Sequence, residues 1–324
     1  RFDYTANSRL AQVSRPGGRS VTYGYDAGDR LAWLRDPEGL VTNYSYNERD
    51  ELISAQLEDQ TVTYAYDLAG RPTVTAWPNG VTGLHDYDER DRLLAQRYLR
   101  GGSPLLTLKY AYSQVGQRVL AEQLSARGRE LRRYTYTDRR ELASSERTVC
   151  SAQEARPRTA RREYRFDANQ NRLRAGSLTA RYNEADQVLA SSDGQSYAHN
   201  PAGQMTTAGQ WSFSYNCSEQ IKTAEKTGVN ATYVYDGNGL RVQKRVSSSA
   251  GIESTDYLWA GAEVLKEYTG QGAAKATYLL GAGREGIKTD AGWHFYLRDA
   301  LGSTVMTTDS SGEVASQFEY GDWG

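Results

Sequence analysis

The sequence predicts an all-β protein in which repeated antiparallel β-hairpins form one continuous, curled or spiralling sheet. One observation is a phrase that returns at a nearly fixed interval, as YGYDAGDRL at Tyr23, YSYNERDEL at Tyr44, YAYDLAGRP at Tyr64 and HDYDERDRL at His85. A second is the aromatic-x-aromatic pair in these copies, which puts both rings on one face of a strand because side chains alternate with period two. A third is the polar turn residue that follows each pair. Self-similarity at a fixed period predicts a repeat array rather than separate cores.

The second aromatic position of each copy sets the register of the repeat. It recurs twelve times, at Tyr4, Tyr25, Tyr46, Tyr66, Tyr87, Tyr112, Tyr136, Phe166, Tyr182, His199, Tyr215 and Tyr235. The steps are 20 or 21 residues as far as Tyr87 and vary between 16 and 30 residues afterwards. A regular period that swells and then shortens is expected when loops of different length are inserted between similar units.

A turn is predicted directly after each ring pair. The next residue is Asp, Asn, Ser or Thr in all twelve copies. The short side chains of these types can bond to backbone N–H groups two or three residues on, which opens a turn. Three residues further, a Gly such as Gly70, or an Asp in other copies, supplies the position where the backbone needs positive φ.

A second turn closes most repeats. RDPEGLVT places Pro37 and Gly39 as in a type I turn, and WPNGVT has Pro78 followed by Asn79-Gly80. Each unit of about 20 residues is therefore predicted to be two strands and two turns, with Tyr rings of successive copies as cross-strand neighbours. The structural positions that we expect to define the repeat are Tyr23, Tyr25, Asp26, Tyr44, Tyr46, Tyr64, Tyr66, Asp67, Gly70, Tyr87, Asp88, Tyr233, Tyr235 and Asp236.

The composition narrows the class of protein. With 39 Lys+Arg against 40 Asp+Glu, the chain has no overall field for nucleic acid. The aromatic residues are mainly Tyr, 24 against 5 Phe, which suits a thin wall better than a thick apolar core. No apolar run approaches the ~18 residues that span a bilayer, and no signal peptide follows Arg1. A start on Arg rather than Met indicates a piece of a longer protein. Cys150 and Cys217 can pair or remain free.

The repeat resembles the YD repeat of the RHS family. YAYDLAGRP and YVYDGNGLRV are the most similar copies. Further on, YLWAGAEVLKEY, YLLGAGREGI and HFYLRDALGSTVMTTDSSGEVASQFEYGDWG resemble the RHS-associated core segment, and Asp299 and Gly302 match its Asp-x-x-Gly-Ser pattern. We therefore expect tandem YD repeats over residues 1–245 and the core segment, continuing the same sheet, over residues 246–324.

The resemblance implies part or all of a hollow shell. In bacterial polymorphic toxins and in the C component of insecticidal toxin complexes, such a shell encloses a toxic C-terminal segment; animal teneurins carry a similar shell for adhesion. In bacterial relatives the core usually ends in an Asp-Pro-x-Gly motif that cuts the toxin free. This sequence reaches Trp323-Gly324 without that motif, so the resemblance assigns no cleavage residue here.

No catalytic, cofactor or metal site is predicted. His85, His199 and His294 lack ligand spacing, and packing is the favoured interpretation of all three. DANQNRL and DGNGL lack the acidic residue that closes a calcium loop, and GAGREG is followed by strand-like sequence rather than a helix. Trp33, Trp77, Trp211 and Trp259 could stack on sugars, but stacking within the sheet needs no ligand.

The arginine-rich stretch Arg139 to Glu163 leaves two interpretations open. A solvated hairpin or loop is one. In the other, the arginines contact an acidic cargo or another piece of the shell, because Arg forks bind carboxylates in a bidentate manner.

The predicted function is a non-enzymatic encapsulating scaffold that encloses a toxic effector. Its expected partners are the rest of the parent RHS protein with its toxin, and secretion or toxin-complex components, without nucleic acid or a membrane span. The expected location is outside the bacterium that makes it. The alternative is an extracellular adhesion or carbohydrate-contacting YD-repeat protein.

Overall fold

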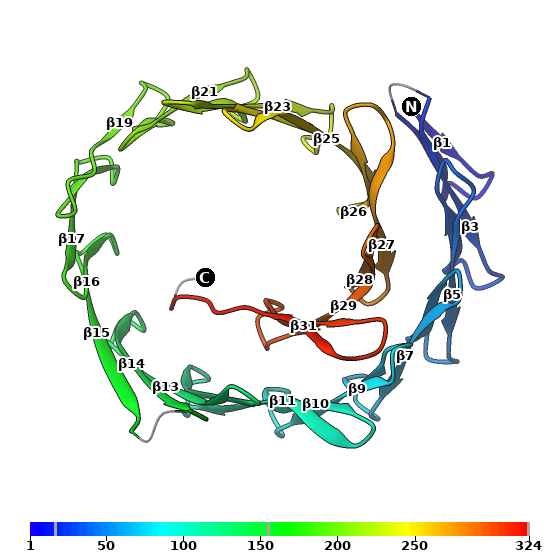
Figure 1. The fold of residues 1–324 in the computed structure, drawn as a ribbon, viewed down its shortest axis with the longest axis horizontal. Coiled ribbons are helices and arrows are strands. Elements are labelled where there is room, and N and C mark those ends of the chain that lie inside the picture. The colour runs from blue at the N-terminus through cyan, green and yellow to red at the C-terminus, as the bar shows by residue number, and fades with distance from the viewer. Residues whose placement is uncertain (16–17, 154–155, 323–324) are drawn as a thin grey trace. The chain divides into compact units, whose positions relative to one another are not determined.

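The chain folds into β-strands and turns (Figure 1). The structure, a computed structural model, describes residues 1–15, 18–153 and 156–322, and no helix occurs among them. Two large antiparallel sheets are formed, one from β1 to β18 and one from β19 to β31. The predicted all-β fold of repeated antiparallel hairpins is thereby confirmed.

The first sheet contains β1 Phe2–Tyr4, β2 Leu10–Ser14, β3 Ser20–Tyr25, β4 Leu31–Arg35, β5 Val41–Tyr46, β6 Leu52–Leu57, β7 Gln60–Tyr66, β8 Pro72–Ala76, β9 Val81–Tyr87, β10 Leu93–Arg100, β11 Ser103–Tyr112, β12 Arg118–Ser125, β13 Gly128–Tyr136, β14 Leu142–Ser151, β15 Arg158–Phe166, β16 Arg172–Ala175, β17 Leu178–Tyr182 and β18 Val188–Ser191. The second contains β19 Tyr197–His199, β20 Met205–Ala208, β21 Trp211–Tyr215, β22 Ile221–Lys226, β23 Val229–Tyr235, β24 Arg241–Ser248, β25 Gly251–Ala260, β26 Glu263–Thr269, β27 Ala274–Leu280, β28 Arg284–Thr289, β29 Gly292–Arg298, β30 Thr304–Asp309 and β31 Val314–Gln317.

Each hairpin is closed by the local chemistry of its turn. At the first full repeat Asp29 donates its N–H to the carbonyl of Asp26, and Asp26 donates to the carbonyl of Arg30. The register then shifts by one residue, so that Tyr25 pairs with Leu31. A type I turn followed by a left-handed residue and a bulge has this pattern. The same shift at the end of the first strand recurs at Tyr46, Tyr66, Tyr215 and Tyr235.

The residue contacts divide the chain into two units. Unit 1 comprises Arg1–Lys109, Leu258–Tyr268 and Ala274–Gly324, and unit 2 comprises Tyr110–Tyr257 and Thr269–Ala273. These units do not test the expected boundary between the YD repeats, residues 1–245, and the core segment, residues 246–324. That boundary stays a prediction.

Unit 1 has two layers of sheet. The strands from β26 to β31, orange to red in Figure 1, lie beside the N-terminal strands, blue to cyan. Side chains from both layers are fully buried, among them Val62 and Leu106 from the N-terminal layer and Leu279 and Phe295 from the C-terminal layer. Apolar side chains buried between two sheets supply most of the favourable free energy of such a unit.

Unit 2 is mainly a single layer of hairpins, green to yellow in Figure 1. Its strands pair with their sequence neighbours and few of its described side chains are buried; Leu142, Tyr164, Ala224 and Ala231 are the apolar ones within its interior strands. The hydrogen-bonded sheet is interrupted between β18 and β19, which are joined by one isolated bridge between Ala190 and Ser196. The predicted continuous sheet is therefore two sheets in hydrogen-bonding terms.

Candidate functional site

The turn aspartates lock each hairpin by accepting several hydrogen bonds. Asp67 Oδ1 accepts from the backbone N–H of Ala69 at 2.9 Å and of Arg71 at 3.0 Å. Asp26 and Asp88 accept from the equivalent groups, two and four residues on. We expected acceptance two or three residues on; the extra residue of the bulge moves the second donor to the fourth position. Such caps satisfy N–H groups that the turn leaves without strand partners.

The fourth turn position has a left-handed backbone in the repeats. Gly70 has φ of +78° and Gly116 of +84°, whereas Asp29 and Glu219 occupy the equivalent position at 61° and 63°. Asn and Asp enter this region more readily than most residues, and Gly enters it without steric cost. The alternation of Gly with polar residues at this position thus has a backbone cause.

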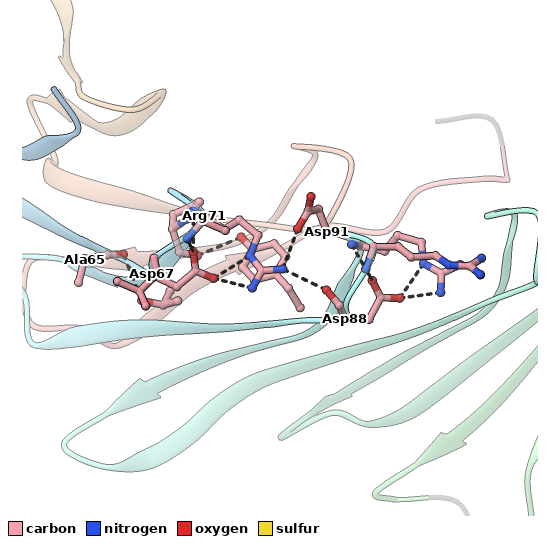
Figure 2. A network of polar contacts seen from close by, with 12 residues as sticks. Ala65, Asp67, Arg71, Asp88 and Asp91 are labelled. Carbon is pink, nitrogen blue, oxygen red and sulfur yellow. Dashed lines mark hydrogen bonds and ion pairs between the residues drawn. The ribbon is translucent and has the colours of Figure 1, made fainter. Parts of the chain in front are cut away.

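In two repeats an arginine joins its own charged turn to the next one, at Arg30 and at Arg71, and Figure 2 shows the second case. Arg71 donates from Nε to Asp67 Oδ2 at 2.7 Å, and from Nη1 to the carbonyl of Asp88 at 3.0 Å and to Asp91 Oδ1 at 2.8 Å. The backbone N–H of Arg71 and then its guanidinium lower the pKa of Asp67. The guanidinium of Arg92 lowers the pKa of Asp88 to about 2. At Arg30 and Arg71, a charged contact therefore links one turn to the next.

In many of the described repeats the hydroxyl of the second ring is bonded to the preceding repeat. Tyr46 Oη donates to the carbonyl of Leu31 at 3.0 Å, and Tyr66 Oη donates to that of Leu52 at 2.8 Å. Tyr25, Tyr87, Tyr136, Tyr182 and Tyr215 make the same contact with the residue that follows the preceding turn. An Arg also lies over the ring of some copies, with the Arg30 Cζ atom 5.0 Å from the centroid of Tyr46. This cation–π contact adds to the hydroxyl bond.

In much of unit 2 the same turn is built with amides. Asn216 Oδ1 accepts from the backbone N–H groups of Ser218 and Gln220, and its Nδ2 donates to Gln220 Oε1 at 3.0 Å. Asn183 with Gln187 and Asn200 with Gln204 repeat the pair. The turn at residue 236 is instead built with a carboxylate, because Asp236 accepts the two backbone N–H groups there. Nearby, Arg241 Cζ lies 5.5 Å from the ring centroid of Tyr233 and 5.3 Å from that of Tyr257.

The first rings of the repeats are more buried than the second. Burial raises the pKa of Tyr23 to about 12, and it also raises the pKa of Tyr44 and of Tyr64. Tyr64 Oη accepts from the N–H of Ala282 in the C-terminal layer at 3.1 Å. The buried hydroxyl of Tyr64 therefore has a partner, as buried Tyr hydroxyls usually do.

The core segment repeats the same turn. Asp299 Oδ1 accepts from the N–H groups of Leu301 and Ser303, each at 2.9 Å, and Gly302 has φ of +81°. Tyr320 Oη donates to the carbonyl of Thr304 at 2.7 Å. We did not predict this last contact from the sequence. The signal was present, because Phe318 and Tyr320 form the same aromatic-x-aromatic pair as in the repeats.

A buried ion cluster joins the two layers of unit 1. Lys266 Nζ lies 2.5 Å from Asp36 Oδ2 and 2.8 Å from Glu38 Oε2, and the side chains of Lys266 and Asp36 are 2% and 3% exposed. Tyr268 Oη donates to Glu38 at 3.0 Å. Burial alone would raise the pKa of Glu38, but the hydrogen bonds from Lys266 and Tyr268 lower it. Sequence alone assigned Asp36 and Glu38 only to a turn.

A second polar contact between these layers surrounds Tyr98. Its hydroxyl donates to the carbonyl of Arg298 at 2.6 Å and accepts from the N–H of Arg298 at 3.2 Å. Glu285 is 3% exposed nearby, and burial raises its pKa. Its Oε1 accepts from the N–H of Gly283 at 3.1 Å and lies 3.9 Å from Arg298 Nη1. Tyr98 and Arg298 thus connect the two layers directly, and Glu285 lies beside this contact.

The predicted histidines occupy different surroundings. His85 packs edge-on against Tyr98, with ring centroids 6.4 Å apart, and burial lowers its pKa. His199 lines a cavity of about 490 Å³ in unit 2, together with Tyr182, Tyr197 and Met205. Among the described residues, no three His, Cys, Asp or Glu side chains are grouped to hold a metal ion. Cys150 and Cys217 are both free.

These features define a class of protein, a repeat scaffold of hydrogen-bonded hairpins. Side chains cap its turns, and Tyr hydroxyls bond many of the hairpins to the preceding repeat. The chain belongs to the Teneurin YD-shell family, whose model matches residues 79–324, and the RHS Repeat model matches residues 4–40. The suspected relationship is thus confirmed.

Curated relatives and solved structures resemble parts of the chain. It is 28% identical over 177 residues to the tRNA3(Ser)-specific nuclease WapA of Bacillus spizizenii, and 26% identical over 177 residues to the tRNA nuclease WapA of Bacillus subtilis. Each match covers 50% of this chain and 7% of the relative, so the chain spans a small part of those proteins.

Among solved structures, a crystal structure of TcdB2-TccC3 matches 99% of the chain and 20% of the other chain, with 15% identity and a TM-score of 0.76. The Photorhabdus luminescens Tc holotoxin pore matches 98% of the chain and 18% of the other, with 17% identity and a TM-score of 0.72. At these identities the likeness concerns the fold. Within the described residues, no helix is long and apolar enough to cross a bilayer.

Proposed function

We propose that this chain forms part of the wall of an RHS/YD-repeat shell, which encloses the toxic C-terminal effector of a bacterial polymorphic toxin. The observation that carries the proposal is the two-layered build of unit 1, seen in a chain of this family. The strands β26–β31 continue the second sheet and pack back onto the N-terminal strands through the Lys266 cluster and Tyr98. A polypeptide that continues beyond β31 would start from this second layer.

The relatives support the same proposal. The curated relatives are named as nucleases that act on tRNA, and the chain matches only a small part of each. A scaffold segment and a nuclease segment within one long protein are the expected division of labour, with the activity outside the part represented here. The wall would act by exclusion, because a folded sheet around an effector keeps substrates away from it until release.

Export from a bacterium follows from this proposal, since a toxin acts on another cell. The partners would be the remaining parts of the parent protein, its effector, and components of a secretion or toxin-complex machinery. The chain itself would carry out no covalent chemistry, and the caps and rings described above would be its working parts.

Protease protection of the intact gene product tests the proposal. The full-length protein from the native gene is treated with protease, and the digestion rate of the segment beyond Gly324 is compared with that of the same segment produced alone. We expect the attached segment to survive at least about tenfold longer, because local opening must precede cleavage. Equal digestion rates, or a mature protein without a retained segment, would favour an adhesion role and overturn encapsulation.

A further inference from the structure

Unit 2 concentrates positive charge in a chain that is otherwise close to neutral. Residues 127–181 contain 15 arginines against 7 Asp and Glu, although the whole chain has a net charge of -1. These arginines lie mainly on the strands β13 to β17, green in Figure 1. The shell wall as such does not need them, because the neighbouring repeats in unit 2 build the same turns with Asn and Gln.

Three of the arginines share one face of the sheet. Arg165 on β15 is directly opposite Arg174 on β16, and Arg174 is opposite Thr179 on β17. Arg181 is two residues after Thr179 on the same strand, so its side chain points to the same side. Opposite pairs have Cβ atoms about 5 Å apart and diagonal pairs about 7–8 Å. The arginine face, defined as Arg165, Arg174 and Arg181, therefore brings three guanidinium groups together.

No carboxylate of the described residues forms an ion pair with the arginine face. In the described parts of the chain, no Asp or Glu lies within ion-pair distance of its three members; Arg174 Nε donates instead to the carbonyl of Gly176 at 2.7 Å. Arg165 and Arg181 are exposed. Like charges directly opposite each other destabilise a sheet. An uncompensated pair of this kind is expected where another molecule supplies the negative charge.

A comparison within the same sheet sharpens this point. Arg132 and Arg147 are also directly opposite each other, on β13 and β14. There Glu130 bridges them, with Oε1 2.5 Å from Arg132 Nε and Oε2 2.5 Å from Arg147 Nη2. The fold thus neutralises one arginine pair internally and leaves the other open on the surface.

We infer that the arginine face is a docking surface for an acidic polypeptide segment. A planar guanidinium with five donors matches a carboxylate in a two-point contact. The remaining side chains on this face of β15 and β17 are Thr159, Arg161, Glu163 and Thr179, and they include no ring on which a base could stack. Single-stranded nucleic acid is bound through such rings. Glu163 would repel a continuous run of phosphates, whereas a polypeptide can place an uncharged or basic residue there.

The inference is independent of encapsulation, because the surface would bind an acidic segment of a cargo or of another protein alike. The test uses the whole chain and a fluorescein-labelled poly-L-glutamate peptide, followed by fluorescence anisotropy at low and physiological salt. The variant Arg165→Gln/Arg174→Gln/Arg181→Gln is expected to bind at least about tenfold more weakly than the native chain. The variant with Lys at all three positions keeps the charge, loses the planar forks and should be intermediate.

A matched control removes three exposed positive charges elsewhere, as Lys109→Gln/Lys222→Gln/Arg245→Gln. This control should bind poly-L-glutamate within about twofold of the native chain, as charges beyond a Debye length are screened. An equal loss of affinity for poly-L-glutamate in both triple variants would show that only the net charge matters, and it would overturn the inference. Failure of the native chain to bind at low salt would do the same.

Two further readouts decide between this inference and its rivals. The thermal midpoint of the Gln variant should equal or exceed that of the native chain, because the variant removes cross-strand repulsion. A lower midpoint than that of the control would assign the arginines to fold stability instead. Tighter binding of duplex or single-stranded DNA than of poly-L-glutamate, abolished by the same triple variant, would make the face a nucleic-acid surface.

Discussion

The fourth position of the repeat turn shows how one backbone angle selects residue types. Gly116 holds φ of +84°, and an added Cβ there would meet no other atom within 4 Å. Glu219 holds φ of 63° at the equivalent position of a later repeat. The sequence predicted a positive φ here from the recurrence of Gly and Asp. Only the structure shows that there is room for a side chain at this position.

Gly116→Ala is expected to lower the free energy of unfolding by about 1 kcal/mol, the cost of a left-handed conformation for an L side chain. Glu219→Gly should raise it, by up to about 1 kcal/mol, because the strain is relieved and part of the gain is lost to unfolded-state entropy. Urea unfolding monitored by tryptophan fluorescence measures both. Changes of the same sign in the two variants would contradict the backbone explanation.

The ring hydroxyls provide a residue-level comparison with a built-in control. Tyr46→Phe removes the hydrogen bond to the carbonyl of Leu31 and is expected to cost about 1 kcal/mol. Tyr4 is the equivalent ring of the first repeat and is 62% exposed. Tyr4→Phe should leave the free energy of unfolding nearly unchanged. If both substitutions lower the free energy of unfolding equally, the hydrogen bond to the preceding repeat makes no specific contribution to stability.

At the scale of elements, two lysines join the C-terminal layer of unit 1 to its N-terminal layer in different surroundings. Lys266 is buried between Asp36 and Glu38, whereas Lys288 pairs with Glu58 at 2.6 Å with side chains 41% and 31% exposed. Both pairs connect segments 228 to 230 residues apart in the sequence. No local pattern predicts such partners, because strand alternation gives the face of a side chain but not the element that covers it.

Lys266→Ala should reduce the free energy of unfolding by about 3–5 kcal/mol, since it leaves the buried Asp36 carboxylate without its counter-charge. Lys288→Ala should cost about 0–1 kcal/mol, the range of exposed ion pairs. Thermal and urea unfolding of both variants give the comparison. Similar losses in the two variants would show that the Lys266 cluster contributes no more than a surface pair.

For the whole molecule, buried tyrosines add to a core that is otherwise mainly aliphatic. Burial raises the pKa of Tyr23 to about 12 and also raises the pKa of Tyr44, Tyr64, Tyr268 and Tyr278 above the ordinary value of 10.0. The folded chain therefore binds these protons more tightly than the unfolded chain. Their contribution to stability is complete below pH 10 and is lost as the pH rises through the folded-state values.

The thermal midpoint should consequently stay level from about pH 8 to about pH 10 and fall steeply between about pH 10 and pH 12. Tyrosinate absorbance, followed over the same range, should rise together with the loss of strand signal in circular dichroism. Tyr268→Phe should make the decline shallower, because one of the raised groups is removed. Complete titration of the tyrosines near pH 10 without loss of structure would exclude this linkage.

The sequence by itself determined the hairpin unit, since its causes are local. The carboxylate or amide after the second ring bonds to N–H groups two and four residues on, and the fourth turn residue takes positive φ, all within a few residues. The hydrogen bond from the second Tyr hydroxyl to the preceding repeat was not predicted, although the regular spacing of these tyrosines was visible in the sequence. Asp299 and Gly302 were singled out by their resemblance to the RHS-associated core, and the structure shows the same turn there as in the repeats.

Only the tertiary structure decided which hairpins acquire a core. The repeats of unit 1 and unit 2 have similar patterns of aromatic and polar residues, yet the first are covered by β26–β31 and the second form mainly one layer. Likewise, Asp36 looks like an ordinary turn residue in the sequence, and only the structure shows Lys266 Nζ 2.5 Å from its carboxylate. The physical reason is that a turn is fixed by atoms a few residues apart, whereas burial depends on which distant strand packs across the sheet.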